Sequence, residues 1–132
     1  MLPRFLMDTH VVVRWLMEAK KLSREQTRVL EGAVRHSEPV ALSAISLIEV
    51  AVLTSEGRLK MSLDEFFEVV QANPLLQVLP LTYEIASEVA SMGRSLRDPA
   101  DRAIVATARV HRLRLITSDQ RIIESKLVPV VE

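Results

Sequence analysis

Two hydrophobic periodicities alternate along the chain. Short apolar runs that close on a polar residue give way to longer stretches in which apolar residues recur at i, i+3 and i+4. The runs are typical of buried strands and the stretches of amphipathic helices. Strands are predicted at 4–7, 39–42, 78–81, 113–116 and 128–131. Helices are predicted at 9–16, 23–36, 43–57, 62–73, 82–92 and 98–112.

Local signals define several helix ends. Ser23 with Gln26, and Ser62 with Glu65, have the spacing of a capping box, in which the two side chains and the two backbone N–H groups bond reciprocally. Pro74 ends the fourth helix because proline lacks the N–H that the helix needs. These signals support the helix boundaries that the periodicity predicts.

The order of the elements indicates the fold class. Short apolar strands alternate with longer amphipathic helices, which is typical of a parallel sheet with right-handed crossovers. No low-complexity tract, repeat or linker interrupts the sequence. We therefore predict an α/β fold with a short, mostly parallel sheet flanked by helices, in a single domain over residues 1–132.

Composition changes this picture only in part. The formal net charge is zero, with 17 basic and 17 acidic residues, so the protein has no global field that would attract nucleic acid. The last third is locally basic, because residues 94–126 hold eight Lys and Arg against four Asp and Glu. Cysteine is absent, which excludes disulfides. No apolar segment approaches the roughly 20 residues that would span a bilayer, so we expect a cytoplasmic protein without a membrane anchor.

The segment from Asp98 to Asp119 carries carboxylates at both ends of a helix-then-strand unit. Asp98 suits the N-cap, Pro99 the first helical position, and Asp101 the first turn, where the helix dipole favours an anion. Asp119 follows the strand. In a parallel sheet, Asp119 then lies beyond the carboxyl end of its strand, at the edge where α/β proteins bind ligands.

Two further acids are expected at this edge. Asp8 follows the first strand in the same way as Asp119, and Glu49 lies beside the apolar stripe of the third helix, where a carboxylate needs a partner. Each acid also has a purely structural interpretation. Asp8, Asp98 and Asp119 would then be helix caps, Asp101 a first-turn acid, and Glu49 a side chain that reaches water from the border of the stripe.

Carboxylates that converge from separate segments would repel one another unless a cation lay between them. Mg²⁺ and Mn²⁺ prefer oxygen ligands and retain several waters, so a few carboxylates suffice without His or Cys. Such a site suits phosphoryl chemistry. The candidate ligands are Asp8, Glu49, Asp98, Asp101 and Asp119. Three hydroxyl residues are candidates for orienting ligands or water, with helix capping as the alternative: Thr9, Thr117 and Ser118.

The other polar side chains carry weaker signals. His10, His36 and His111 have no metal-ligand spacing and are interpreted as surface or cap residues. Arg97 and Arg102 lie near the predicted site and could meet a phosphate backbone, although a solvated face is the simpler interpretation.

Four segments together resemble the PIN-domain ribonucleases, and most closely the VapC-type toxins of bacterial and archaeal toxin–antitoxin pairs. They are FLMDTHVVVRWL, LSAISLIEVAVL, RDPADRAIVATARVHRLRLITSD and VPVV. None is specific alone, but their order and spacing match nearly the whole chain. The resemblance implies a PIN-like three-layer sandwich, with Asp8, Glu49, Asp101 and Asp119 as the acidic quartet and Asp98 as an additional acid.

The resemblance also implies a function. The expected activity is RNA cleavage with Mg²⁺ or Mn²⁺ by a homodimer that a cognate small antitoxin holds inactive. Residues 58–73 match no family motif, so the antitoxin-binding groove is not located by the resemblance. The pairs Phe66, Phe67 and Leu59, Met61 are predicted to be exposed apolar residues that a partner could cover.

Three alternatives compete with this interpretation. A receiver-like phosphoacceptor would need adjacent acids after the first strand and a lysine after the last, and the sequence has DTH there and no such lysine. A phosphatase with two aspartates two residues apart is disfavoured because position 10 is His. A PIN nuclease acting on structured DNA or in ribosomal RNA processing remains open.

Overall fold

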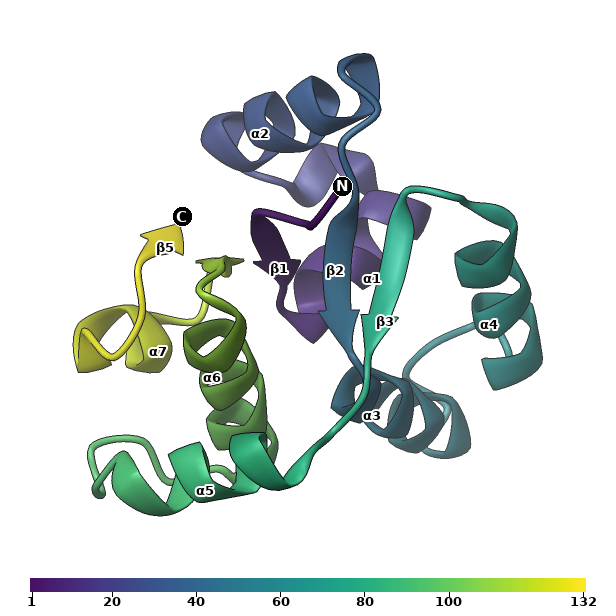
Figure 1. Cartoon of the computed structure of the whole chain (residues 1–132). Helices are drawn as coiled ribbons and strands as arrows, with labels where there is room; N and C mark the ends of the chain where they lie inside the picture. The colour runs from purple at the N-terminus through teal and green to yellow at the C-terminus, as the bar shows by residue number, and fades with distance from the viewer.

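The computed structural model describes residues 1–132 as a five-stranded, fully parallel sheet in the order β3-β2-β1-β4-β5 (Figure 1). The strands are β1 (Phe5–Met7), β2 (Val40–Ser43), β3 (Leu76–Leu79), β4 (Arg114–Ile116) and β5 (Val130–Val131). The α-helices are α1 (Thr9–Met17), α2 (Arg24–Arg35), α3 (Ala44–Ser55), α4 (Leu63–Ala72), α5 (Tyr83–Ser91), α6 (Pro99–His111) and α7 (Gln120–Ser125), and a 3-10 turn, η1, spans Ala19–Lys21. The predicted α/β class and parallel sheet are confirmed.

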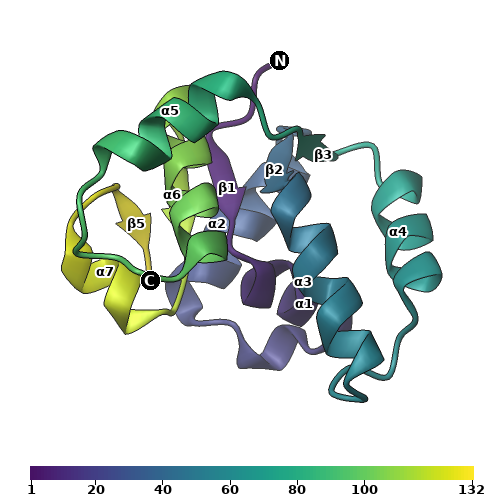
Figure 2. The same cartoon turned by 90° about the horizontal axis from the view of Figure 1, so that it is seen from below.

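Two hydrophobic cores cover the two faces of the sheet. Alternate strand residues point to opposite faces, so Met7 packs with α1, α2 and α4 while its neighbour Leu6 packs with α5, α6 and α7. Helix α3 lies along one end of the sheet, beside α1 and α4 (Figure 2). The result is a three-layer sandwich with a buried sheet, as parallel sheets require.

One of the two predicted capping boxes is complete in the structure and the other is incomplete. At α2 both bonds of the capping box are present, since Gln26 N–H bonds to Ser23 Oγ and Ser23 N–H to Gln26 Oε1, each at 3.0 Å. At α4 only one is present, from Glu65 N–H to Ser62 Oγ at 3.1 Å. Glu65 is exposed, and its carboxylate remains in water instead of bonding back.

Three sequence predictions are corrected. Strand β3 lies at 76–79 instead of 78–81, because Leu76 is buried while Pro80, which has no N–H for the ladder, ends the strand. The last strand, β5, covers only Val130–Val131 instead of residues 128–131. Helix α7 was not predicted, because its six residues are too few for a periodic pattern and it is buried mainly through Ile122.

The predicted exposed apolar pairs are also corrected. Phe66 is 0% exposed and belongs to the core beneath α4. Leu59 and Met61 are partly buried against the same core, so only Phe67 of the four is an exposed side chain. The phenyl ring of Phe66 fills the space between α4 and the sheet, which the sequence pattern alone did not reveal.

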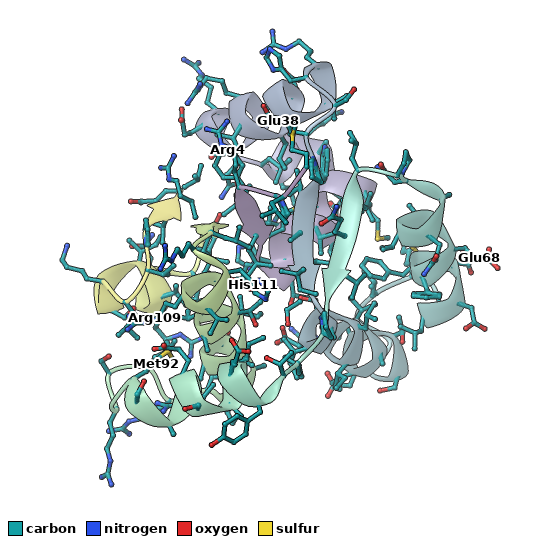
Figure 3. All side chains as sticks on the ribbon, in the orientation of Figure 1. Arg4, Glu38, Glu68, Met92, Arg109 and His111 are labelled. Atoms are coloured by element: carbon teal, nitrogen blue, oxygen red, sulfur yellow. The ribbon has the colours of Figure 1, made fainter.

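The amino edge of the sheet lies opposite the carboxyl edge, at which the candidate acids are expected. Arg4 and Glu38, labelled in Figure 3, lie at this edge. Their side chains form an ion pair of 3.5 Å. None of the helices is both long and apolar enough to cross a membrane.

Candidate active site

All five predicted acids line one groove at the carboxyl edge of the sheet. The groove has a volume of about 680 Å³. Asp8 follows β1, Glu49 lies on α3 after β2, and Asp119 follows β4. Because β2, β1 and β4 are adjacent and parallel, their carboxyl ends meet at this edge. Helix α6 adds Asp98 and Asp101.

Asp8 joins the ends of two strands. Its Oδ1 accepts the Thr9 N–H at 2.8 Å and so caps α1, while its Oδ2 accepts the Thr117 hydroxyl at 2.7 Å. The backbone N–H of Asp8 bonds to the Ile116 carbonyl at 3.0 Å. Asp8 is therefore a helix cap and also a buried carboxylate that lines the groove.

Glu49 is held by a hydroxyl pair. The Thr9 hydroxyl donates a short hydrogen bond to Glu49 Oε1, and Thr9 Oγ1 lies 2.8 Å from the buried Ser46 Oγ. Burial raises the pKa of Glu49, the bond from Thr9 opposes this shift, and the charges of Asp8 and Asp98 add to it. The partner expected for this carboxylate is thus Thr9, and no cation of the protein pairs with it.

Asp101 shows the strongest electrostatic effect. Asp98 Oδ1 accepts the Asp101 N–H at 2.9 Å, so Asp98 is the N-cap of α6 and Asp101 lies in its first turn. Burial raises the pKa of Asp101 to about 7, together with repulsion from Asp98, Asp8 and Asp119. Because Asp8 and Asp119 belong to other segments of the chain than α6, this repulsion indicates that the acids share one local field.

Asp119 is the N-cap of α7. Its Oδ1 accepts the Arg121 N–H at 2.9 Å. The Arg121 guanidinium lies 3.2 Å from Asp119 Oδ2 and 3.7 Å from Asp101 Oδ2. Burial raises the pKa of Asp119, but the hydrogen bonds from Arg121 outweigh it and the net shift is downward.

The three hydroxyl candidates occupy different positions. Thr9 holds Glu49, and Thr117 bridges Asp8 and the Asp119 N–H, which it accepts at 3.0 Å. The Ser118 hydroxyl instead accepts a bond from Gln26 Nε2 at 3.0 Å, so it faces α2 and does not line the groove.

Among the groove residues that sequence reasoning missed, three follow a predicted site acid closely in the sequence: His10, Arg14 and Arg121. His10 Nε2 accepts the Ser118 N–H at 2.9 Å, and its Nδ1 lies 3.6 Å from Asp8 Oδ2. Burial lowers the pKa of His10 despite the charge of Asp8. Arg14 and Arg121 also line the groove. The available signal was their position, two to six residues after a predicted site acid.

Neither arginine proposed to meet phosphate lies in this groove. Arg102 donates three hydrogen bonds of 2.7 Å to the carbonyls of Val89, Gly93 and Leu96, so it clamps the loop before α6. Arg97 is exposed beside a separate surface cavity on the same loop.

The donor set fits a hard divalent cation. The five predicted carboxylates line the groove together with Glu18 and Glu56, and neither a thiolate nor an unhindered imidazole competes with their oxygens. Burial is the main cause of the raised pKa values of Glu49 and Asp101, and the charges of neighbouring acids add a repulsion that a cation would relieve. No three of these side chains converge tightly on one point, and Arg121 lies between two of them.

Comparison with known proteins places the fold and site in a family. The PIN domain model matches residues 5–126. This chain belongs to the PIN domain family. A PIN domain accounts for the parallel sheet and for the acids at its carboxyl edge, and it decides against the receiver-like and phosphatase alternatives.

Individual relatives agree with this PIN assignment. The chain is 31% identical over 118 residues to Ribonuclease VapC22 of Mycobacterium tuberculosis, covering 89% of this chain and 88% of that protein. A chain of the crystal structure of VapBC2 from Rickettsia felis bound to a DNA fragment from their promoter superposes with a TM-score of 0.72 at 13% identity, covering 96% of each chain. A chain of the crystal structure of FitAcB from Neisseria gonorrhoeae superposes with a TM-score of 0.70 at 23% identity, covering 97% of this chain and 96% of that one.

Proposed function

We propose that this PIN domain is a metal-dependent endoribonuclease that acts as the toxin of a type II toxin–antitoxin pair. The observation that carries the proposal is the convergence of Asp8, Glu49, Asp98, Asp101 and Asp119 on one groove. The identity to Ribonuclease VapC22 supports RNA as the substrate.

Asp8, Asp101, Asp119 and Glu49 would hold Mg²⁺ or Mn²⁺, with Asp98 as a further ligand. When bound, such a cation polarises a phosphate and makes water a nucleophile at neutral pH. Asp101 must lose its proton to act as a ligand, and its pKa of about 7 places that step in the physiological range.

The protein's own residues orient the acids. Thr117 fixes Asp8 Oδ2, and Thr9 fixes Glu49, so two carboxylates from different elements are held with little freedom. His10 ties α1 to the loop that carries Asp119 by accepting the Ser118 N–H. These bonds pre-organise the groove before a ligand enters, which reduces the reorganisation that catalysis would otherwise require.

A small cognate antitoxin is the proposed protein partner. The structural neighbours include toxin–antitoxin complexes such as VapBC2 and a complex from Klebsiella pneumoniae, which supports an antitoxin for this chain. We further propose a homodimer that acts on cellular RNA in the cytoplasm. The antitoxin would bury apolar surface as it folds and present a basic side chain to the acids.

Metal-dependent cleavage tests the proposal. Purified protein is incubated with total cellular RNA, with EDTA, and with Mg²⁺ or Mn²⁺ restored after chelation, and the new RNA ends are mapped. We predict that EDTA abolishes cleavage and that the cations restore it. Full activity in EDTA would refute a metal-dependent site. Cleavage of structured DNA in preference to RNA would favour the alternative of a PIN nuclease that acts on structured DNA.

A further inference from the structure

Arg121 is the one cation that bonds to two acids of the groove. Its guanidinium contacts Asp119 Oδ2 at 3.2 Å and Asp101 Oδ2 at 3.7 Å, and its Nε lies 3.4 Å from Asp119 Oδ1. It therefore joins the carboxylate after β4 to the carboxylate of α6. Of the other two groove arginines, Arg14 forms no ion pair, and Arg58 pairs only with Glu56.

The position of Arg121 does not serve its own helix. It lies in the first turn of α7, where the helix dipole disfavours a positive charge. Its side chain is 73% exposed, so it contributes little to packing. A cation held there by two acids, against the dipole and without burial, is explained by the charge of the groove.

We propose that Arg121 exchanges between the groove acids and the RNA backbone, as the countercharge of Asp101 and Asp119 in the metal-free groove and as a phosphate-positioning residue once a divalent cation replaces it. This inference rests on the proposed ribonuclease function. Because Asp101 and Asp119 are both candidate ligands, a cation and the guanidinium compete for the same oxygens. The long, exposed side chain can then swing to an anion at the groove mouth, and its planar fork suits a phosphate.

The competition predicts an unusual change in metal affinity. Arg121→Gln removes the competing charge, so Mg²⁺ and Mn²⁺ should bind about two- to fivefold more tightly, the effect of losing an exposed ion pair. Arg121→Lys keeps the charge and should stay near wild type. Arg14→Gln is the matched control, since it removes a groove charge that is not paired with the acids, and should change affinity less than Arg121→Gln. Isothermal titration of the metal-free proteins measures all three.

The second role predicts the opposite change for RNA. In saturating Mg²⁺, Arg121→Gln should raise the KM for a single-stranded RNA about three- to tenfold with a smaller change in kcat, because one phosphate contact is lost. The slope of log RNA affinity against log salt concentration should also decrease by about the contribution of one phosphate contact. Arg121→Lys should recover part of the KM. Thermal melts confirm that the variants are folded.

The outcomes separate this inference from the proposed function. Tighter metal binding together with a higher KM supports the exchange. If wild type binds cations and cleaves RNA, then unchanged or weaker metal binding in Arg121→Gln, or an unchanged KM, overturns the exchange but leaves the proposed function standing. If wild type neither binds a cation nor cleaves RNA, the proposed function fails as well.

Discussion

At the scale of single residues, structural and chemical roles coincide in the same side chains. Asp98 caps α6 through Oδ1, and Asp119 caps α7 in the same way. A sequence shows that an aspartate precedes a helix, which is why capping and metal binding competed as interpretations. A carboxylate has two oxygens and several lone pairs, so capping leaves capacity for a ligand. Capping therefore does not exclude a role in the site.

Neutralising a groove acid should not destabilise the metal-free protein. Asp101→Asn relieves repulsion from three neighbouring acids, and Glu49→Gln retains an oxygen for the Thr9 hydroxyl. We predict that both variants are as stable as wild type or more stable, by up to roughly 3 kcal/mol for two charges about 5 Å apart at a dielectric of 20. Stabilisation by added Mg²⁺ should weaken.

Asp64→Asn is the matched control for that experiment. Asp64 is an exposed first-turn acid of α4 and should lose about 0.3–1 kcal/mol of dipole interaction, with an unchanged Mg²⁺ response. Thermal melts with and without Mg²⁺ measure all three variants. Lower melting of Asp101→Asn and Glu49→Gln with a wild-type Mg²⁺ response would assign these acids to the scaffold.

The pH dependence of stability follows from Asp101. Its pKa rises from 3.8 to about 7 on folding, so the native protein binds more protons than the unfolded chain between these values. This contribution to stability is therefore full below pH 3.8 and is lost as the pH rises through about 7. We predict that the metal-free wild type loses more stability than Asp101→Asn between pH 5 and 8, measured by urea unfolding. Parallel profiles for the two proteins would contradict the shift.

At the scale of elements, the sequence predicted what periodicity and caps encode. Every long helix was predicted because amphipathic spacing is a local signal, and the edge that gathers the acids was predicted because alternating strands and helices indicate parallel strands. Helix α7 escaped because six residues give no period, and Arg121 on it was missed for the same reason. The sequence shows that the last third of the chain is rich in basic residues. The partners of those residues depend on tertiary contacts, which the sequence pattern does not reveal. Arg102 thus donates to carbonyls and not to phosphate.

The Arg102 clamp should support the site from a distance. Arg102→Met removes three hydrogen bonds that hold the loop leading to Asp98. We predict that it lowers the free energy of unfolding by about 1.5–3 kcal/mol and weakens Mg²⁺ binding. Arg109, labelled in Figure 3, is the matched control on α6, because it bonds to the Leu127 carbonyl at 2.7 Å and does not line the groove. Arg109→Met should destabilise the fold but leave Mg²⁺ binding intact. If both variants lose the same amount of Mg²⁺ affinity, Arg102 affects the site only through the overall stability of the fold.

At the scale of the whole molecule, the groove combines the acids with exposed apolar side chains of α3. Ile48 and Val52 of α3 line it and are 57% and 48% exposed. This surface replaces the Phe66 pair as the exposed apolar region beside the acids. A partner that covers it would reach the carboxylates at the same time, as the proposed antitoxin must.

Ile48→Asp should therefore abolish partner binding without destabilising the protein. Tagged wild type, purified from its native host, should carry a small protein encoded by a neighbouring gene, identified by mass spectrometry. Val34→Asp is the control, since Val34 is 50% exposed on α2 and does not line the groove. Retention of the same partner by Ile48→Asp, or its loss from both variants, would place the interface elsewhere.

The central claim is that the groove acids perform metal-dependent cleavage, and cleavage by Asp101→Asn beside Asp64→Asn tests it most directly. Both variants lose one first-turn carboxylate, and only Asp101 faces the groove. With one defined RNA and saturating Mg²⁺, we predict that Asp101→Asn loses at least about 10²-fold in rate while Asp64→Asn remains at the wild-type rate. Wild-type cleavage by a folded Asp101→Asn variant would contradict the account.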